Sequence, residues 1–473
     1  MLPPLIHRHR SGTEPSSNER GFTMALVAVA LLSIVAMAAL SIDIGTLYQA
    51  KAEAQRAADA AALTAARVIS ISGITGDPSN ATDSWEKVCR GAGSPASLAA
   101  INIAQQNLIG GNAASTVKVY YGTSSGVGTN EDCSGAKASF GVNPVVKVYV
   151  QQAKLPTFFA RVFSMIPTGT SSNSGVSATA SAEVFNPSGS GNGTAANVIP
   201  VQPRCVKPWI IPNLDPKNLP NQFVLPAGDI ATQGIYTVNK GVIGEKFDIN
   251  ADCAPGASNC HGNNLTDNPP GWNGRLNAQF LEYIPALISG NPGAIPSCSP
   301  ATGYQAAIAG CDQTSVYACG TPSGAQADLT ENPVSPDGPT GDTSTAVSCL
   351  TQSAPTYSGA DSLSTTTFPF QIQAGSGSPL VLHGVLSSGD SITTSNSIAT
   401  IPIYDRTKLV RLKGRAHPDV TIVGFLQVFI NGVDATTGNI NVTVLNVAGC
   451  SNNAANSPVT GTSPVPVRLI TSP

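Results

Sequence analysis

One segment of the chain has the letters of a hydrolytic active site. Residues Gly122-Thr123-Ser124-Ser125-Gly126 match Gly-x-Ser-x-Gly, which in α/β-hydrolases holds a nucleophilic serine on a strand-to-helix turn. A strand-like run precedes this pattern, but no helical pattern follows it. Because the chain is rich in serine and glycine, we expect the match to arise by chance. We therefore do not assign Ser124 as a nucleophile.

Groups that could act as general bases or metal ligands are few. Beyond the N-terminal pair His7 and His9, the histidines are isolated, and none belongs to an HExxH motif: His261, His383 and His417. Asp248 to Asp252 has the alternating spacing of calcium ligands. An EF-hand loop would need glycine and glutamate where Cys253 and Asn259 stand, so we interpret this spacing as chance.

Two other aspartates begin sequences that come close to the adhesion-type metal motif Asp-x-Ser-x-Ser. Neither Asp342 nor Asp361 completes it, and the chain has no GxxxxGK[ST] phosphate-binding loop. The sequence therefore predicts no catalytic residues, no cofactor-binding residues, no metal ligands and no cofactor. We expect a protein that is not an enzyme.

The ten cysteines indicate disulfides and an oxidising compartment, since none forms a CxxC motif and all follow residue 88. Cys89 and Cys133 stand alone in the first part of the chain, so we predict that they pair. Eight more cysteines follow, which allow 105 pairings. Among these, Cys253–Cys260 is the local expectation, and Cys205–Cys450 would join the two ends of the second part of the chain.

An uncharged apolar run, Phe22 to Ile42, is the strongest structural feature of the sequence. A helix of this length spans roughly 30 Å, about one bilayer core. We expect a permanent membrane anchor. The alternatives are a secretory signal cleaved before Ala39, a pilin-type leader cleaved after Gly21, and a buried helix of a soluble core. A pilin-type leader would carry glutamate where Leu26 stands.

The helix is expected to continue past the membrane as a stalk. Residues 43–69 contain no proline and are dominated by alanine, the best helix former. A stripe of mostly small residues lies along one face: Leu47, Ala54, Ala58, Ala61 and Ala65. Glu53, Arg56 and Asp59 lie on the opposite face. Small residues let helices approach closely, so the stripe packs either on another protein's helix or on the protein's own domain.

Charge and composition bear on orientation and partners. Three arginines precede the apolar run, Arg8, Arg10 and Arg20, and two basic residues follow it closely, Lys51 and Arg56. The positive-inside rule therefore places the N-terminus in the cytoplasm by a small margin. Only 11% of residues are charged and the net charge is −3, which excludes electrostatic attraction to nucleic acid.

Composition divides the chain into five predicted segments. Residues 1–20 form a cytoplasmic tail, residues 21–43 a transmembrane helix, and residues 44–186 a stalk with a small α+β module. Residues 187–197, rich in glycine and serine, form a linker, and residues 198–473 form a cysteine-rich, loop-rich, mainly β exported domain.

Within these segments the periodicity predicts individual elements. Helices are expected at 95–108 and 156–163, and strands at 117–121, 145–151 and 176–185. The runs 420–431 and 439–447 are expected to form a hairpin.

The N-terminal residues resemble the TadE/TadG-like proteins of the tight-adherence (Flp) pilus assembly system. Three features carry the resemblance: Arg20-Gly21 before the apolar run, the stretch SIDIGTLY at 41–48, and the block AADAAALTAA at 57–66. Shorter likenesses occur at PTFFAR (156–161), SATASA (177–182) and CVKPWIIP (205–212).

The resemblance implies a single-pass inner-membrane protein whose bulk is periplasmic or surface-exposed. Such a protein would be a minor pilin-like or assembly component of a Tad-type pilus or secretion system. Its implied partners are the lipid bilayer and, through the stalk helix, other pilus-assembly membrane proteins or pilins. The alternatives are a surface adhesin or ligand-binding ectodomain that shares only the anchor and, more remotely, a secreted hydrolase.

Overall fold

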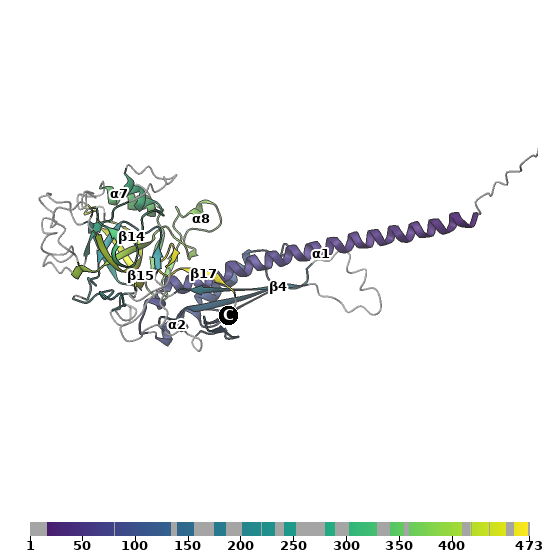
Figure 1. Cartoon of the computed structure of the whole chain (residues 1–473), viewed down its shortest axis with the longest axis horizontal. Helices are drawn as coiled ribbons and strands as arrows, with labels where there is room; N and C mark the ends of the chain where they lie inside the picture. Colours follow the sequence, from purple (N-terminus) through teal and green to yellow (C-terminus); the bar gives the residue numbers. More distant parts are fainter. Residues whose placement is uncertain are drawn as a thin grey trace, which may run out of the picture.

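A single long helix projects from a β-rich body (Figure 1). The computed structural model describes residues 17–79, 81–133, 140–155, 175–185, 201–218, 220–231, 241–251, 280–288, 302–328, 341–353, 359–408, 417, 419–434, 436–450 and 458–471. We call the projecting helix α1 and the described residues from 73 onward the head. This is the architecture expected from the sequence, an apolar N-terminal helix followed by small helices and a loop-rich, mainly β domain.

Helix α1 is continuous from Ser17 to Ser72. Its 56 residues give a length of about 84 Å. The helix contains no proline, and alanine dominates its second half, which favours helix over any competing structure. The helix ends where Gly73 takes a φ of 83°, a left-handed conformation that glycine adopts without steric cost. The predicted continuity of membrane run and stalk is confirmed.

The second half of α1 lies on a five-stranded antiparallel sheet, in the order β17-β4-β3-β1-β2. The strands are β1 (Thr116–Thr123), β2 (Gly126–Val127), β3 (Pro144–Gln152), β4 (Val176–Val184) and β17 (Val467–Ile470). Three helices accompany them: η1 (Ile74–Gly76), α2 (Thr82–Cys89) and α3 (Pro95–Gln106). The α+β elements predicted at 95–108, 117–121, 145–151 and 176–185 are confirmed. The helix predicted at 156–163 lies outside the described residues.

Six strands of the head close into a barrel. Their order is β13-β6-β8-β7-β15-β14, and β13 also pairs with β14, which completes the ring. The strands are β6 (Trp209–Pro212), β7 (Lys246–Ala251), β8 (Phe280–Pro285), β13 (Ile398–Tyr404), β14 (Asp419–Val433) and β15 (Ile440–Gly449). β9 (Gly320–Gln326) extends the sheet beside β14. The predicted hairpin is confirmed as the antiparallel pair β14–β15.

Large side chains fill the core of the barrel region, which also includes residues from the surrounding helices and loops. Its largest members are less than 2% exposed and include Trp209, Tyr283, Phe223, Phe247 and Phe429. Closing a sheet on itself leaves no free strand edge and encloses a dry interior. The barrel region therefore has an aromatic and aliphatic core of its own, distinct from the alanine-rich core between α1 and the first sheet.

Smaller elements surround the barrel. They are the helices α6 (Gly303–Ala309), α7 (Asp342–Thr351), α8 (Pro379–Leu382) and η3 (Arg406–Lys408), the three-stranded sheet of β10 (Ser362–Ser364), β11 (Gln371–Gln373) and β12 (Ser391–Ile392), and the parallel pair of β5 (Val201–Pro203) with β16 (Val459–Gly461). Helix α7 contacts β14 and lies above it in the view of Figure 1.

The end of α1 is joined to the barrel by buried hydrogen bonds. Asn446 on β15 donates from Nδ2 to the Ser70 carbonyl at 2.7 Å and to Thr75 Oγ1 at 2.9 Å. Ser70 donates from Oγ to the Val465 carbonyl at 2.6 Å. Gly73 allows the close approach, because a Cβ there would collide with a β15 carbonyl oxygen. We call this contact the joint.

The C-terminal strand returns to the first sheet. β17 pairs with β4, and Arg468 donates to Glu183 from Nε at 2.9 Å and from Nη2 at 2.8 Å. Glu183 is 5% exposed, so this ion pair is shielded from solvent on one side. The sheet around α1 is thus completed by residues from the far end of the chain. The five predicted segment boundaries stay predictions, and the linker 187–197 lies outside the described residues.

Candidate membrane anchor and assembly interface

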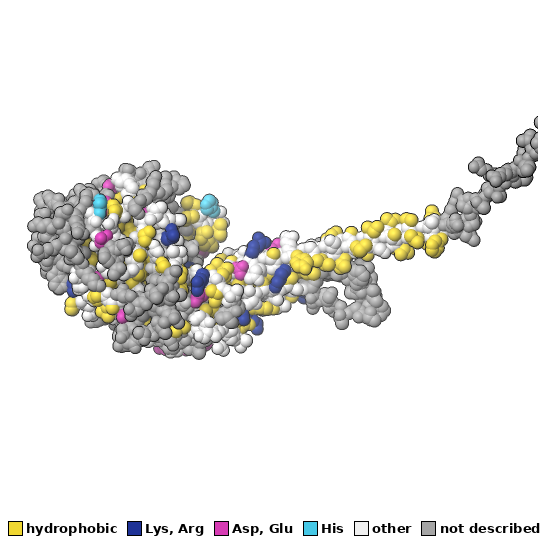
Figure 2. Space-filling view, viewed as in Figure 1, with side chains coloured by type: hydrophobic (Ala, Val, Ile, Leu, Met, Phe, Trp, Pro, Cys, Tyr) yellow, Lys and Arg dark blue, Asp and Glu magenta, His cyan; other side chains and the backbone are white. Residues whose placement is uncertain are grey.

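The first half of α1 presents large apolar side chains in every direction. Between Phe22 and Ile42 the side chains are mostly exposed, for example Met24 at 79% and Leu32 at 70%. Figure 2 shows this half as a yellow rod that extends away from the head. Such a surface is unstable in water but matches the hydrocarbon core of a bilayer. By length and composition, α1 is able to cross a membrane.

The second half of α1 has the opposite character. Most of its alanines are buried, and seven of them are 0% exposed: Ala54, Ala57, Ala58, Ala61, Ala62, Ala65 and Ala66. They pack on β3 and β4 and on α3, whose own alanines at 96, 100 and 104 are also fully buried. Small side chains on both helices allow this close packing.

This packing decides between the two interpretations of the alanine stripe. Four of its five members, from Ala54 to Ala65, are fully buried and Leu47 is partly buried, all against the protein's own α+β module. The stripe is therefore an internal core surface. A contact with a second protein has to use other faces of α1, of which the exposed apolar half is the largest.

Polar contacts fix the point where α1 enters the head. Asp43, the first charged residue after the apolar run, is only 2% exposed. Lys51 donates to the Ser177 carbonyl, and Gln55 donates to the Thr179 carbonyl, both on β4. Glu53 accepts from the Gly110 backbone at 2.7 Å, and this bond lowers the pKa of the Glu53 carboxyl. These contacts set the angle at which the apolar half leaves the head.

The serine of the hydrolase-like pattern lies in a hairpin turn. Thr123 pairs with Gly126 across the turn between β1 and β2, and Ser124 is exposed. A nucleophile elbow requires a strand-to-helix turn, which this segment does not form. The position of Ser124 therefore supports the interpretation of the pattern as a chance match.

The candidate bases and metal ligands that the structure describes do not come together. His383 is exposed just after α8, and His417 is exposed and pairs with Asp328 at 3.5 Å. Asp248 lies on β7, Asp342 in the first turn of α7 and Asp361 beside β10. Each accepts hydrogen bonds from the protein itself, Asp248 from Asn441, Asp342 from Gln305, and Asp361 from Gly375 and Ser395.

Within the described residues, no three His, Cys, Asp or Glu side chains are grouped as metal ligands would be. The segment 252–279, with Cys253, Cys260 and His261, lies outside them, as do His7 and His9.

The disulfides confirm one predicted pairing and correct another. Cys89 pairs with Cys133, as predicted. The pairing Cys205–Cys450 is wrong, because Cys205 pairs with Cys311 and Cys450 with Cys319. Cys349 is disulfide-bonded as well, and the predicted pair Cys253–Cys260 lies outside the described residues.

The physical reason for the correction lies in the strands. The ends of the second region are joined by the parallel pair β5–β16, in which Val201 lies opposite Val459. This pairing leaves Cys205 next to the end of α6, where its backbone donates to the Asp312 carbonyl, rather than next to Cys450. The ends of the second region are therefore joined by the strand pair β5–β16, where the sequence predicted a disulfide.

These features define a class of protein, a β-rich head carried on one N-terminal helix with the dimensions of a membrane anchor. Residues 21–68 match the Tad family model, described as "Putative Flp pilus-assembly TadE/G-like". The resemblance drawn from the N-terminal residues is therefore confirmed, and the segment that anchors the head is a domain of the pilus-assembly type. No curated protein and no solved structure matches the chain.

Proposed function

We propose that this protein is a non-catalytic structural or assembly component, minor pilin-like, of a Tad-type pilus or secretion system. The observation that carries the proposal is the division of α1. One half is exposed and apolar, and the other half packs in the core of the head. Residues of both halves lie within the segment that matches the pilus-assembly family model. A subunit of this form presents a helix to the membrane and to neighbouring helices, while its head stays folded without them.

The proposed orientation has the N-terminus in the cytoplasm and the head in the periplasm or at the cell surface. Three disulfides in the described residues support this side, because disulfides persist in oxidising compartments. The basic residues before the apolar run support it by the positive-inside rule. Protease added to intact spheroplasts is expected to digest the head. Protection of the head in spheroplasts, with digestion after lysis, would place it in the cytoplasm instead.

We also propose that α1 is retained uncleaved. Its helix continues without a break from the apolar half into the head, so cleavage before Ala39 would release the head from the membrane. N-terminal sequencing of the mature protein tests this point. A mature N-terminus at Phe22 would indicate a pilin-type leader, and one at Ala39 would indicate a secretory signal.

Deletion of the gene tests the assembly role. We expect loss of surface pili, or of adhesion that depends on them, with recovery when the wild-type gene is restored. The matched control is a restored gene with Ser124→Ala. Because Ser124 is exposed in a hairpin turn, this variant is expected to restore pili fully. Normal pili in the deletion strain would remove the assembly role, and failure of Ser124→Ala alone would favour a hydrolase.

A further inference from the structure

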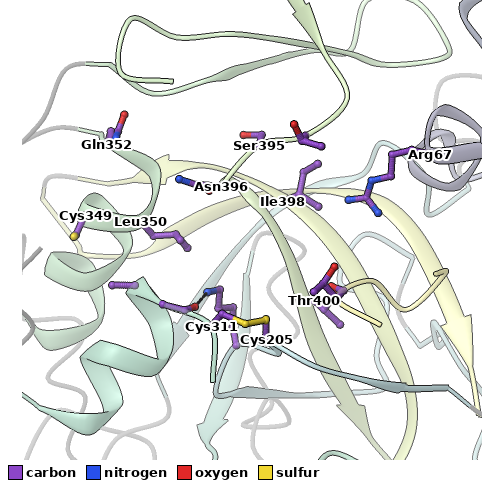
Figure 3. Close-up of a pocket in the computed structure, with 15 residues that line it drawn as sticks. Arg67, Cys205, Cys311, Cys349, Leu350, Gln352, Ser395, Asn396, Ile398 and Thr400 are labelled. Carbon is purple, nitrogen blue, oxygen red and sulfur yellow. Dashed lines mark hydrogen bonds between the residues drawn. A yellow bond between two sulfur atoms is a disulfide. The ribbon is translucent and has the colours of Figure 1, made fainter. Parts of the chain in front are cut away.

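A basic cavity lies where the end of α1 meets the head. It has a volume of about 510 Å³ and is lined by parts of α1, the end of α6, the end of α7, and β13 with the loop before it (Figure 3). We call it the junction cavity. Its volume falls in the range of sites that hold small organic ligands, roughly 300–1,000 Å³.

Two cationic side chains line the junction cavity. Figure 3 shows the guanidinium of Arg67 directed from α1 toward β13. Lys207 is 4% exposed, and its ammonium donates to the carbonyls of Ile308 and, at 2.8 Å, of Gly310 at the end of α6. An ammonium has three N–H donors, so one remains for another acceptor.

No carboxylate balances these charges among the described residues that line the cavity. In the described part of the chain, Arg67 has no hydrogen-bond or ion-pair partner. Burial lowers the pKa of Arg67, with no carboxylate to raise it again. Burial likewise lowers the pKa of Lys207 to about 7. Lys207 is buried and Arg67 is half-buried. Charge that is shielded from water without a counter-charge destabilises a fold, and an anion in the cavity would compensate it.

The remaining lining is neutral and polar, with a small apolar wall. Gln352, Thr394 and Asn396 offer amides and a hydroxyl, whereas Leu350 and Ile398 offer aliphatic surface. The planar fork of an arginine matches the two oxygens of a carboxylate or a phosphate. These groups together fit a small organic molecule that carries one such oxyanion and several hydrogen-bonding groups.

We propose that the junction cavity is a binding site for a small oxyanion ligand, carboxylate or phosphate, held by Arg67 and Lys207. Because Arg67 belongs to α1 and Lys207 to the head, the ligand bridges the anchor helix and the barrel region. Binding therefore stabilises the arrangement of α1 on the head. This inference stands on the cavity alone and holds whether or not the protein assembles into a pilus.

The test uses the full-length protein in detergent micelles, with inorganic phosphate and citrate as probes and chloride at equal ionic strength as the reference. Calorimetry is expected to show saturable binding at one site per chain for at least one probe, with a dissociation constant in the millimolar range or below. Which probe binds more tightly distinguishes a phosphate from a carboxylate ligand. Absence of saturable binding by both probes overturns the proposal.

Variants decide whether Arg67 carries the binding. Arg67→Gln is expected to weaken binding about tenfold or more, which is 1.4 kcal/mol or more, and Arg67→Lys to weaken it less. The matched control is Arg204→Gln, since Arg204 is exposed nearby and donates to the Gln313 carbonyl at 2.8 Å. This control is expected to bind as the wild type does. Equal affinity of Arg67→Gln and wild type overturns the assignment.

A second readout separates a binding role from a structural one. In ligand-free buffer, Arg67→Gln is expected to unfold at the same temperature as the wild type or higher, because it removes a half-buried charge that has no counter-charge among the described residues. In saturating ligand the order reverses, since only the wild type gains stability by mass action. A loss of stability without ligand would show that Arg67 supports the fold, and the proposal would fail.

Discussion

The two halves of α1 are one helix in two environments. Between Phe22 and Ile42 the large apolar side chains are exposed, whereas between Ala54 and Ala66 one face of small alanine side chains is buried. Both halves are rich in good helix formers, so helix propensity does not separate them. The difference lies in what surrounds the helix. Fluid lipid chains can surround apolar side chains of any size. A close-packed protein core instead leaves room only for side chains of a particular volume.

A second difference concerns what each half contributes to folding. The exposed half has no contact partner in the head, and the buried half is sandwiched between α3 and the β3–β4 sheet. The fold of the head therefore depends on the buried half of α1. A truncated protein that lacks all of α1 would therefore lose part of the alanine-rich core as well as the membrane anchor.

The largest expected effect comes from the same substitution placed in each half. Ala58→Leu inserts a branched side chain into a site with no free surface and is expected to cost about 3 kcal/mol or more of head stability. Ala38→Leu, in the exposed half, is expected to leave head stability unchanged. Denaturation of both proteins in detergent, followed by the fluorescence of buried Trp85 and Trp209, measures the difference. Equal stabilities of the Ala58→Leu and Ala38→Leu proteins would show that the two halves of α1 do not differ in their contribution to the stability of the head.

The next effect concerns the joint. Gly73→Ala places a Cβ against the Leu445 carbonyl and against Ile243, at a φ of 83°, and is expected to cost about 2 kcal/mol. Gly91→Ala is the control, because Gly91 has a φ of 70° but open space around a Cβ. It should cost only the backbone strain, about 1 kcal/mol. Equal losses would mean that the close approach of α1 to β15 contributes nothing.

Local sequence patterns predicted the elements but not their long-range arrangement. The long helix, the strands β1, β3 and β4 of the first sheet and the hairpin β14–β15 follow from periodicity and propensity within short windows, whereas β2 and β17 were not predicted. Closure of the barrel depends on the parallel pairs β6–β13 and β7–β8, which join segments far apart in the sequence and leave no local trace. The same holds for the disulfide Cys205–Cys311 and for the placement of Arg67 and Lys207 around one cavity.

The alanine stripe illustrates this limit in a single element. Its period showed which face of α1 would be buried, and the face is buried. The period could not show what would cover it, because α3 and an external helix present the same small residues. Only the path of the chain through α2 and α3 back onto α1 decides between them.

An effect of pH is expected on the head and not on the apolar half of α1, since residues 22–42 contain no titratable group. Burial, and then the nearby Asp215 carboxylate, raise the pKa of Glu245 to about 9. The folded state then keeps a proton that the unfolded state releases above about pH 4.5, so this group's contribution to stability falls as pH rises between these values.

Glu245→Gln tests this contribution, because the amide keeps the shape of the neutral acid. The variant is expected to gain stability over the wild type progressively as pH rises from about 4.5 to about 9. Denaturation midpoints of both proteins across this range measure the gain. If the two pH curves ran parallel, Glu245 would not titrate differently in the folded state.

The smallest effect on the stability of the head is expected from substitutions in the exposed apolar half of α1. For these variants, pilus formation is the informative measurement. Because Leu32 is 70% exposed, Leu32→Ala should change head stability by less than about 0.5 kcal/mol. If anchors of neighbouring subunits pack side by side, the shorter side chain leaves a gap in that contact and pilus formation falls. Leu32→Ile, of equal volume, is the control and should preserve assembly. Loss of head stability in Leu32→Ala would contradict the division of α1, whereas normal pili from both variants would show that this position of the anchor meets lipid only.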